Sequence, residues 1–178
     1  MGEFLPRFTQ RLILRRFTAD DLDRFLAYRQ DPQVARFQGW KMLSADEAKA
    51  FIQEMNQAAI GVPGEWFQVA VAHRQSNQLV GDIGMNVDLD DPAIVEIGFT
   101  LARAEQGKGY AQEAVQALIA SLFELGTVTR IVGITDGRNQ RSINLMMRLG
   151  MGLVRSEEVE FRNERCVEQT FELRKIDS

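Results

Sequence analysis

The chain has 178 residues, of which 45% are apolar and 26% are charged, and its formal net charge is −4. This balance predicts one soluble domain over residues 1–178 with an ordinary hydrophobic core, and the acidic charge argues against nucleic acid as a partner. The sequence has no apolar run near the roughly 20 residues of a membrane span, and its single cysteine and single histidine favour a reducing, cytoplasmic protein without a disulfide or a metal site.

The first third of the chain predicts one strand and two helices. Leu12, Leu14 and Phe17, which lie among arginines, predict a strand with one buried face. Thr18 is a candidate N-cap for a helix that Asp31-Pro32 would end. Ser44, followed three residues later by Glu47, predicts a capping box at the start of the second helix.

The remaining two thirds alternate predicted strands and helices. Strands are expected at residues 66–73, 79–87, 93–101, 130–134, 152–161 and 166–173, and helices at residues 111–125 and 140–149. Together the elements predict an α/β fold of the α+β type, in which about four helices flank a mixed, mostly antiparallel sheet of about seven strands.

The segment at residues 106–111 separates an apolar strand from a long amphipathic helix. Glycines let the backbone approach a ligand closely, and a helix N-terminus offers unpaired N–H groups and the positive end of its dipole. The segment therefore predicts a phosphate site, although a similar turn also occurs without a ligand. Tyr110 stands where a Walker loop needs lysine, and Gln112 where a dinucleotide fingerprint needs its third glycine, so a nucleotide-dependent enzyme is disfavoured.

Four segments, in order along the chain, fit one known pattern. Residues 106–111 satisfy Gln/Arg-x-x-Gly-x-Gly/Ala, and the apolar strand at residues 95–101 precedes them. Residues 139–151 fit Asn-x-x-Ser-x-x-Leu-x-x-Lys-Leu-Gly-Phe, with Arg for Lys and Met for Phe. The pattern resembles the GNAT superfamily of acetyl-coenzyme A-dependent N-acetyltransferases, and residues 11–22 resemble the opening of its RimJ/RimL-like branch.

The resemblance implies the GNAT fold, acetyl-CoA as the cofactor, and direct transfer of the acetyl group to a primary amine in a ternary complex. The amine acceptor would be a protein N-terminus or a small amine. A non-catalytic acyl-CoA-binding or regulatory module is the alternative, because Met146 replaces the tyrosine that many relatives use as general acid. The sequence leaves open the identity of the acceptor and whether the protein is a homodimer.

The resemblance also assigns the residues that bind the cofactor. Main-chain groups would bind the pantetheine arm along the strand that ends at residue 101, and the pyrophosphate at the glycine loop. The start of the helix at residues 140–149 would lie against the thioester. The set comprises Phe99, Thr100, Leu101, Gln106, Gly107, Lys108, Gly109, Tyr110, Ala111, Gln112, Asn139, Ser142 and Met146. Two members have plainer interpretations, because Lys108 suits a solvated loop and Asn139 a helix cap.

Two residues are assigned to proton transfer. Glu96, in an apolar strand, is the candidate general base, because partial burial would raise its pKa. The alternatives for Glu96 are an ion pair with Arg16 or Arg103, or simple exposure. Ser142 would assist the leaving thiolate, which is a mild demand because the thiol pKa is only about 8.5. His73 is expected to be a surface residue.

The acceptor site is assigned to Trp40, which lies in an irregular segment between two predicted helices. In relatives of this kind that region shapes the acceptor site. Trp66 and Phe67 are further candidates for its walls, with Asp82 and Asp88 supplying negative charge for a cationic amine. Aromatic residues in strands more often belong to the core, and that alternative stays open.

Overall fold

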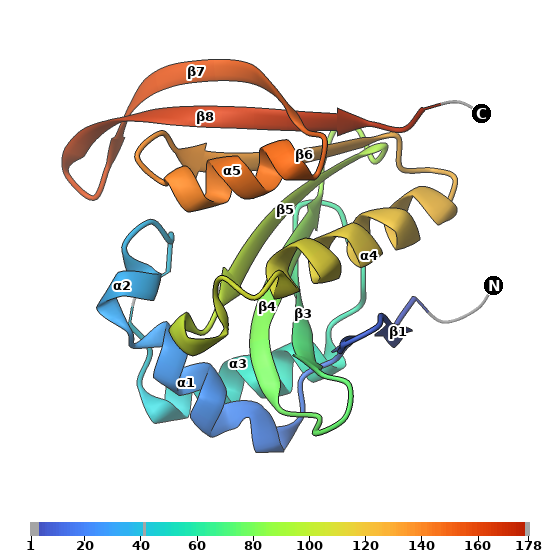
Figure 1. Ribbon diagram of the computed structural model, residues 1–178, viewed down its shortest axis with the longest axis vertical. Helices are drawn as coiled ribbons and strands as arrows, with labels where there is room; N and C mark the ends of the chain where they lie inside the picture. The colour runs from blue at the N-terminus through green and yellow to red at the C-terminus, as the bar shows by residue number, and fades with distance from the viewer. Residues whose placement is uncertain (1–3, 41, 177–178) are drawn as a thin grey trace.

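The computed structural model describes residues 4–40 and 42–176. These residues contain one eight-stranded sheet with the order β1-β2-β3-β4-β5-β6-β8-β7 (Figure 1). The strands are β1 Arg7–Phe8, β2 Leu12–Arg15, β3 Trp66–His73, β4 Leu79–Val87, β5 Ile94–Leu101, β6 Arg130–Asp136, β7 Gly152–Phe161 and β8 Glu164–Arg174. Strands β5 and β6 run parallel, and the other neighbouring pairs are antiparallel.

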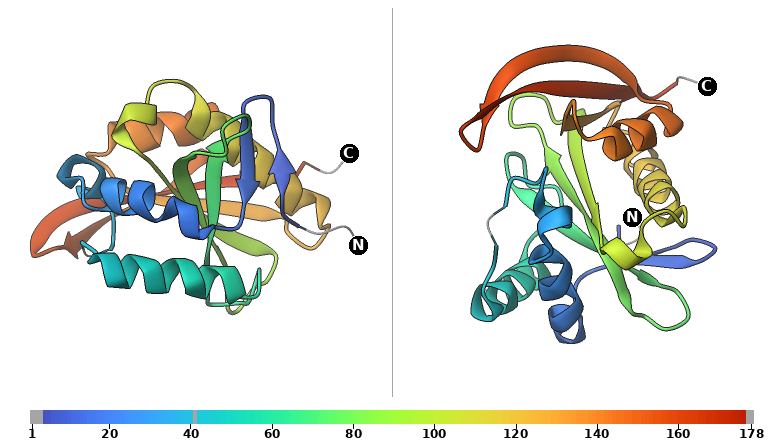
Figure 2. Two further views of the ribbon diagram at one scale, coloured as in Figure 1. Left: turned by 90° about the horizontal axis from the view of Figure 1, so that it is seen from below. Right: turned by 60° about the vertical axis from the view of Figure 1, so that its left-hand side comes forward.

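Helices flank both faces of this sheet. They are α1 Leu22–Arg29, α2 Pro32–Ala35, α3 Ala45–Gln57, α4 Tyr110–Glu124 and α5 Gln140–Arg148, with 3-10 turns η1 Ala19–Asp21 and η2 Arg103–Glu105. Helices α4 and α5 lie on one face, and α1 and α3 lie on the other (Figure 2). In the described part of the chain, no helix is long and apolar enough to cross a membrane.

The predicted mixed, mostly antiparallel sheet with flanking helices is confirmed, but it has one strand and one α-helix more than expected. Strand β1 is only two residues long, too short to produce an alternating pattern. Asp31-Pro32 was expected to end a helix, and the same residues also begin α2. Proline suits the first helical turn, where its missing N–H has no partner to lose, and Asp31 caps the turn by accepting from the Gln33 N–H at 2.9 Å.

The local start signals of the other N-terminal helices are confirmed. The Ser44 N–H donates to Glu47 Oε2 at 2.7 Å, and the Glu47 N–H donates to Ser44 Oγ at 3.3 Å, which is the predicted capping box of α3. The Thr18 N–H donates to Asp21 Oδ2 at 2.8 Å, so the chain turns at Thr18 into η1 and α1. Residues a few positions apart fix these helix starts without help from the rest of the chain.

The two parallel strands separate part-way along their length. Strands β5 and β6 pair from Ile94↔Arg130 to Ile97↔Gly133 and no further. Beyond that point β5 stays paired with β4, and β6 stays paired with β8. The β6-facing edge of residues 98–101 therefore has no strand partner, and the two strands diverge (Figure 1). This parting of β5 and β6 lies next to the glycine loop, which follows the end of β5.

Candidate functional site

The glycine loop leads from the end of β5 into the N-terminus of α4. Gly107 and Gly109 have φ angles of 77° and 82°, in the left-handed region that favours glycine, and Gly109 is the N-cap of α4. Within the described residues, no main-chain hydrogen bond is donated by the N–H groups of residues 107–112. These donors and the positive end of the helix dipole together suit an anion.

Gln106 ties this loop to two other elements. Its Nε2 donates to the Leu101 carbonyl at 3.0 Å, which holds the loop to the last residue of β5. Its Oε1 accepts from Arg141 Nη1 at 2.6 Å, which connects the loop with the first turn of α5. Arg141 was not among the predicted site residues, because the family pattern leaves its position unassigned and only the folded chain brings it to Gln106.

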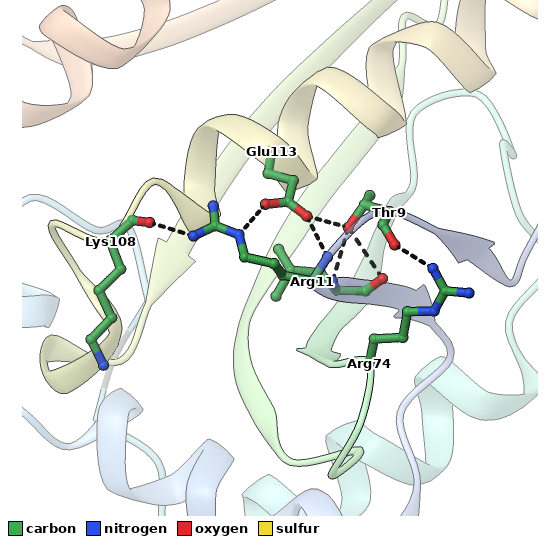
Figure 3. A network of polar contacts seen from close by, with 6 residues as sticks. Thr9, Arg11, Arg74, Lys108 and Glu113 are labelled. Carbon is green, nitrogen blue, oxygen red and sulfur yellow. Dashed lines mark hydrogen bonds and ion pairs between the residues drawn. The ribbon is translucent and has the colours of Figure 1, made fainter.

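The other flank of the loop is held by the turn between β1 and β2 (Figure 3). Arg11 Nη1 donates to the Lys108 carbonyl at 3.0 Å, and Arg11 Nε pairs with Glu113 Oε2 at 2.6 Å. Thr9 Oγ1 and the Arg11 N–H both donate to Glu113 Oε1, at 2.6 and 2.8 Å. Burial alone would raise the pKa of Glu113, but these hydrogen bonds outweigh it and hold the pKa below its ordinary value.

His73 lies beside the loop, which the sequence did not predict. His73 pairs with Leu12 across strands β2 and β3. The His73 ring is edge-on to the Tyr110 ring, with the two centroids 5.1 Å apart, and His73 Nε2 lies 3.5 Å from Glu105 Oε2. The same Glu105 oxygen pairs with Lys108 Nζ at 3.1 Å. The Lys108 side chain is therefore engaged with a neighbouring acid. His73, which was expected at the surface, is partly exposed and packs beside the loop.

The start of α5 carries the predicted Asn139 and Ser142. Asn139 is the N-cap, and its Oδ1 accepts from the Ser142 N–H at 3.3 Å, as the capping interpretation required. The Ser142 hydroxyl makes no hydrogen bond to the described residues, and its side chain is half-buried. Met146 is 1% exposed, and its sulfur lies 2.6 Å from where a Cβ on Gly133 would stand. Its assignment to the cofactor is corrected, because Met146 fills the core over that glycine.

The last residues of β5 offer main-chain groups to the parting of β5 and β6. Thr100 and Leu101 have buried side chains, and Phe99 packs against the core, so these residues face the parting with their backbone. Gly98 continues the regular pairing with Gly84, and nothing lies within 4 Å of a Cβ built on it. Alternate residues share a face of a strand, so this open position lies on the same face as Glu96.

Glu96 comes one residue before Ile97, the last position at which β5 pairs with β6, and it is half-buried. Burial, and then the negative charges of Glu168 and Asp88, raise the pKa of Glu96 above its ordinary value. Neither expected ion pair forms, because Arg16 donates to the carbonyls of Met55 and Asn56 and Arg103 pairs with Asp31. The raised pKa predicted for this carboxyl is thus present, and its role in proton transfer stays a prediction.

Two of the residues considered for the acceptor site are core residues. Asp82 is 2% exposed and pairs with Arg29 at 3.0 Å while the Tyr28 hydroxyl donates to it, so its charge is not offered to an amine. Phe67 is 2% exposed and packs in the core. Asp88 is exposed, but its Oδ1 already accepts from the N–H groups of residues 90 and 91.

The two tryptophans differ in their surroundings, and their place in an acceptor site stays a prediction. Trp66 is 42% exposed, on the strand row that continues through Asn86 to Glu96. Trp40 is half-buried and stacks on the Arg29 guanidinium at 3.7 Å. The turn between β7 and β8 reaches the same segment, because Arg162 Nη2 donates to the Trp40 carbonyl at 3.0 Å and to the carbonyl of residue 38 at 2.7 Å. Trp40 therefore contacts both the buried Arg29, which pairs with Asp82, and the tip of the β7–β8 hairpin.

Residues 11–152 match the family model of the acetyltransferase (GNAT) domain. The chain belongs to the GNAT acetyltransferase family. Among curated relatives it is similar to an uncharacterized N-acetyltransferase, p20, of Bacillus licheniformis, with 30% identity over 155 residues that cover 85% of this chain and 86% of p20.

Solved structures share this GNAT fold. A GNAT-family acetyltransferase from Bacillus anthracis superposes with a TM-score of 0.83 at 22% identity, covering 96% of this chain and 98% of the other. A candidate ribosomal-protein-serine acetyltransferase from Vibrio cholerae gives a TM-score of 0.79 at 28% identity, covering 96% and 98%. RimL, the ribosomal L7/L12 alpha-N-protein acetyltransferase, solved with coenzyme A, gives a TM-score of 0.78 at 16% identity, covering 93% and 95%.

The GNAT domain brings most predicted site residues to the parting of β5 and β6. The loop residues Gln106 to Ala111 lie at one side, residues 99–101 form an edge, and Asn139 and Ser142 lie at the start of α5. Gln112, also predicted, lines a surface hollow with Thr9 and Arg11. Met146 is excluded by its burial. The contacts of the remaining residues with a cofactor stay predictions.

Proposed function

We propose that this GNAT domain transfers the acetyl group of acetyl-CoA to a primary amine by direct attack in a ternary complex. The free N–H groups of residues 107–112 beside the parting of β5 and β6 carry the proposal. They fit a diphosphate, and the unpaired edge of residues 98–101 fits an extended chain with amide groups. Acetyl-CoA has both parts and supplies an activated thioester.

Glu96 is the proposed general base. An amine is mostly protonated near neutral pH, so a base must remove a proton before the amine can attack. The raised pKa of Glu96 makes it a better proton acceptor than an ordinary carboxylate. The open position over Gly98, on the same face of β5, leaves room for an acceptor beside it.

The acceptor is proposed to enter from the side of Trp40 and Trp66, away from the glycine loop. Both a protein N-terminus and a small amine satisfy this arrangement. A RimJ/RimL-like activity toward a ribosomal protein is supported by the likeness to the Vibrio cholerae protein, named as a ribosomal-protein-serine acetyltransferase, at 28% identity. Ser142, whose hydroxyl is free of hydrogen bonds among the described residues, is proposed to assist departure of the thiolate.

An acceptor screen tests the proposed function. Purified protein would be incubated with acetyl-CoA and a panel of N-terminal peptides, polyamines, aminoglycosides and amino-acid derivatives, and the release of free thiol followed. Thiol release that depends on the acceptor is the expected result. Tight binding of coenzyme A by calorimetry, with no acceptor-dependent release across the panel, would favour a non-catalytic acyl-CoA-binding module.

A further inference from the structure

We propose that Arg11 is a positioning residue for the glycine loop: it holds the Lys108 carbonyl on one side so that the Gly109 N–H faces a bound diphosphate on the other. The inference rests on the proposed function, because the diphosphate is that of coenzyme A. It gives a role to the β1–β2 turn, which lies outside the glycine-loop pattern and far from it in the sequence.

The first step is the orientation of one peptide unit. In a trans peptide the C=O and the following N–H point in opposite directions. Arg11 Nη1 holds the Lys108 C=O at 3.0 Å, so the Gly109 N–H points away from the β1–β2 turn. Helix α4 lies between that turn and α5 (Figures 1 and 2), and α5 carries the Arg141 side chain that reaches the loop. The Gly109 N–H is thereby turned away from the flank that Arg11 occupies.

The second step is the need for such a brace. Gly107 and Gly109 both have positive φ angles, and glycine backbones rotate more freely than those of other residues. The Lys108–Gly109 peptide ends at a glycine, so rotation at Gly109 lets this peptide flip at little cost unless another group holds it. The Arg11 side chain also lies beside Gly109, since its Nη2 is 3.3 Å from where a Cβ on Gly109 would stand.

The third step is that Arg11 is itself fixed and neutralised. Its Nε pairs with Glu113 Oε2 at 2.6 Å, and its own N–H donates to Glu113 Oε1 (Figure 3). Its guanidinium lies 4.6 Å from the Tyr110 ring centroid. Thr9 completes the hydrogen bonding of the Glu113 carboxylate. Because Glu113 cancels the charge of Arg11, the main effect of Arg11 on a diphosphate is to orient the loop, and direct attraction is secondary.

Calorimetry with coenzyme A and with pantetheine, which lacks the diphosphate, tests the proposal. Arg11→Ala is expected to weaken coenzyme A binding about tenfold, the loss of roughly one charge-assisted hydrogen bond, and to leave pantetheine binding unchanged. The matched control is Arg74→Ala, because Arg74 Nη1 donates to the Thr9 carbonyl at 2.9 Å but contacts neither the loop nor Glu113. This control should bind coenzyme A as the parent does.

Glu113→Gln separates orientation from charge. If Arg11 acts by orientation, loosening its partner weakens coenzyme A binding; if Arg11 acts as a direct cation, removing the opposing carboxylate strengthens it. The Gly109 amide signal in a ¹⁵N–¹H spectrum gives an independent readout, and its shift on coenzyme A addition should be reduced in Arg11→Ala and kept in Arg74→Ala.

Three results would overturn the proposal. They are unchanged coenzyme A affinity in a folded Arg11→Ala protein, tighter binding by Glu113→Gln, and an equal loss of pantetheine and coenzyme A affinity. Each leaves the proposed function standing as long as the parent protein binds coenzyme A. A parent protein that does not bind coenzyme A would reject the proposed function, and the role of Arg11 with it.

Discussion

Single residues decide how the acids of this chain behave. Asp82 and Glu113 each pair with an arginine, at 3.0 and 2.6 Å, so both carboxylates hold parts of the structure together. Glu96 has no ion-pair partner within the described residues, and burial raises its pKa. A carboxylate kept half-buried without a partner is costly for folding, and such groups concentrate at functional sites.

Glu96→Gln tests this view of the base. We expect turnover to fall by about 10²–10⁴-fold, the usual contribution of a general base, and the acidic limb of the pH–rate profile to disappear. In the parent, activity is lost as the pH falls through the raised pKa of Glu96, so this limb should lie above the ordinary glutamate value of about 4.3. Equal activity of the variant and the parent at every pH would leave Glu96 without a catalytic role.

The stability of the same variant serves as its control. A raised pKa means that the ionised carboxylate is less favourable in the folded chain than in the unfolded one. Its cost is therefore fully present above the folded pKa, declines as the pH falls from there, and is gone below the unfolded pKa. Glu96→Gln should therefore keep or raise the Tm at pH 7.

Glu168→Gln should move the acidic limb of the pH–rate profile toward lower pH, because the negative charge of Glu168 contributes to the raised pKa of Glu96.

The Ser142 hydroxyl is expected to matter less. Ser142→Ala should lower turnover by about tenfold or less with nearly unchanged cofactor affinity, because a thiolate leaves without much assistance. The helix cap survives the change, since Asn139 accepts from the Ser142 N–H and not from its hydroxyl. A loss of activity as large as that of Glu96→Gln would make Ser142 the principal acid.

Gly109 has a matched control at the other end of the same helix. Gly109→Ala and Gly126→Ala both place a Cβ at a positive φ, of 82° and 79°, which should cost each variant about 1–2 kcal/mol of stability. The new Cβ on residue 109 would also stand 3.3 Å from Arg11 Nη2, whereas nothing lies within 4 Å of one on residue 126. Only Gly109→Ala should also weaken coenzyme A binding, because only Gly109 lies among the free N–H groups. Calorimetry and thermal unfolding of both variants decide the matter, and equal coenzyme A affinity in the two would contradict the loop assignment.

At the scale of elements, the tip of the β7–β8 hairpin closes one side of the acceptor region. Trp40→Ala is an ambiguous test, because Trp40 also covers Arg29 in its buried pair with Asp82. Arg162→Ala removes the hydrogen bonds from the hairpin tip to the segment before α3, together with the local contact between the Arg162 guanidinium and the Phe161 ring. It should raise the acceptor KM while leaving acetyl-CoA affinity unchanged. Arg165→Ala, an exposed change in the same hairpin, should have no effect on either.

Much of the fold could be predicted because its signals are local. Capping residues, strand alternation and the glycine loop each depend on neighbours a few positions away, and the structure has the corresponding elements.

The contacts of the candidate site were harder to predict from the sequence. Arg11 and Glu113 lie 102 residues apart, and Arg141 meets Gln106 across 35. The prediction for Met146 was wrong because the side chain of this α5 residue packs on Gly133 of strand β6, which is distant in the sequence. The free edge of β5 makes no demand on side chains, so only resemblance predicted it.

At the scale of the whole molecule, β5 and β6 join two parts of the sheet over a short length, from Ile94 to Ile97. Strands β1 to β5 lie on one side of this junction, and β6 to β8 lie on the other. A short junction of this kind can act as a hinge, about which the two parts open and close by local fluctuation. A ligand that binds to both parts stabilises the closed form. It therefore slows the exchange of amide hydrogens with solvent even at residues that the ligand does not contact. Hydrogen exchange with and without coenzyme A should therefore show slowing along β6 and β8 as well as in the glycine loop, and slowing confined to residues 106–112 would mean that the two parts are already rigidly joined.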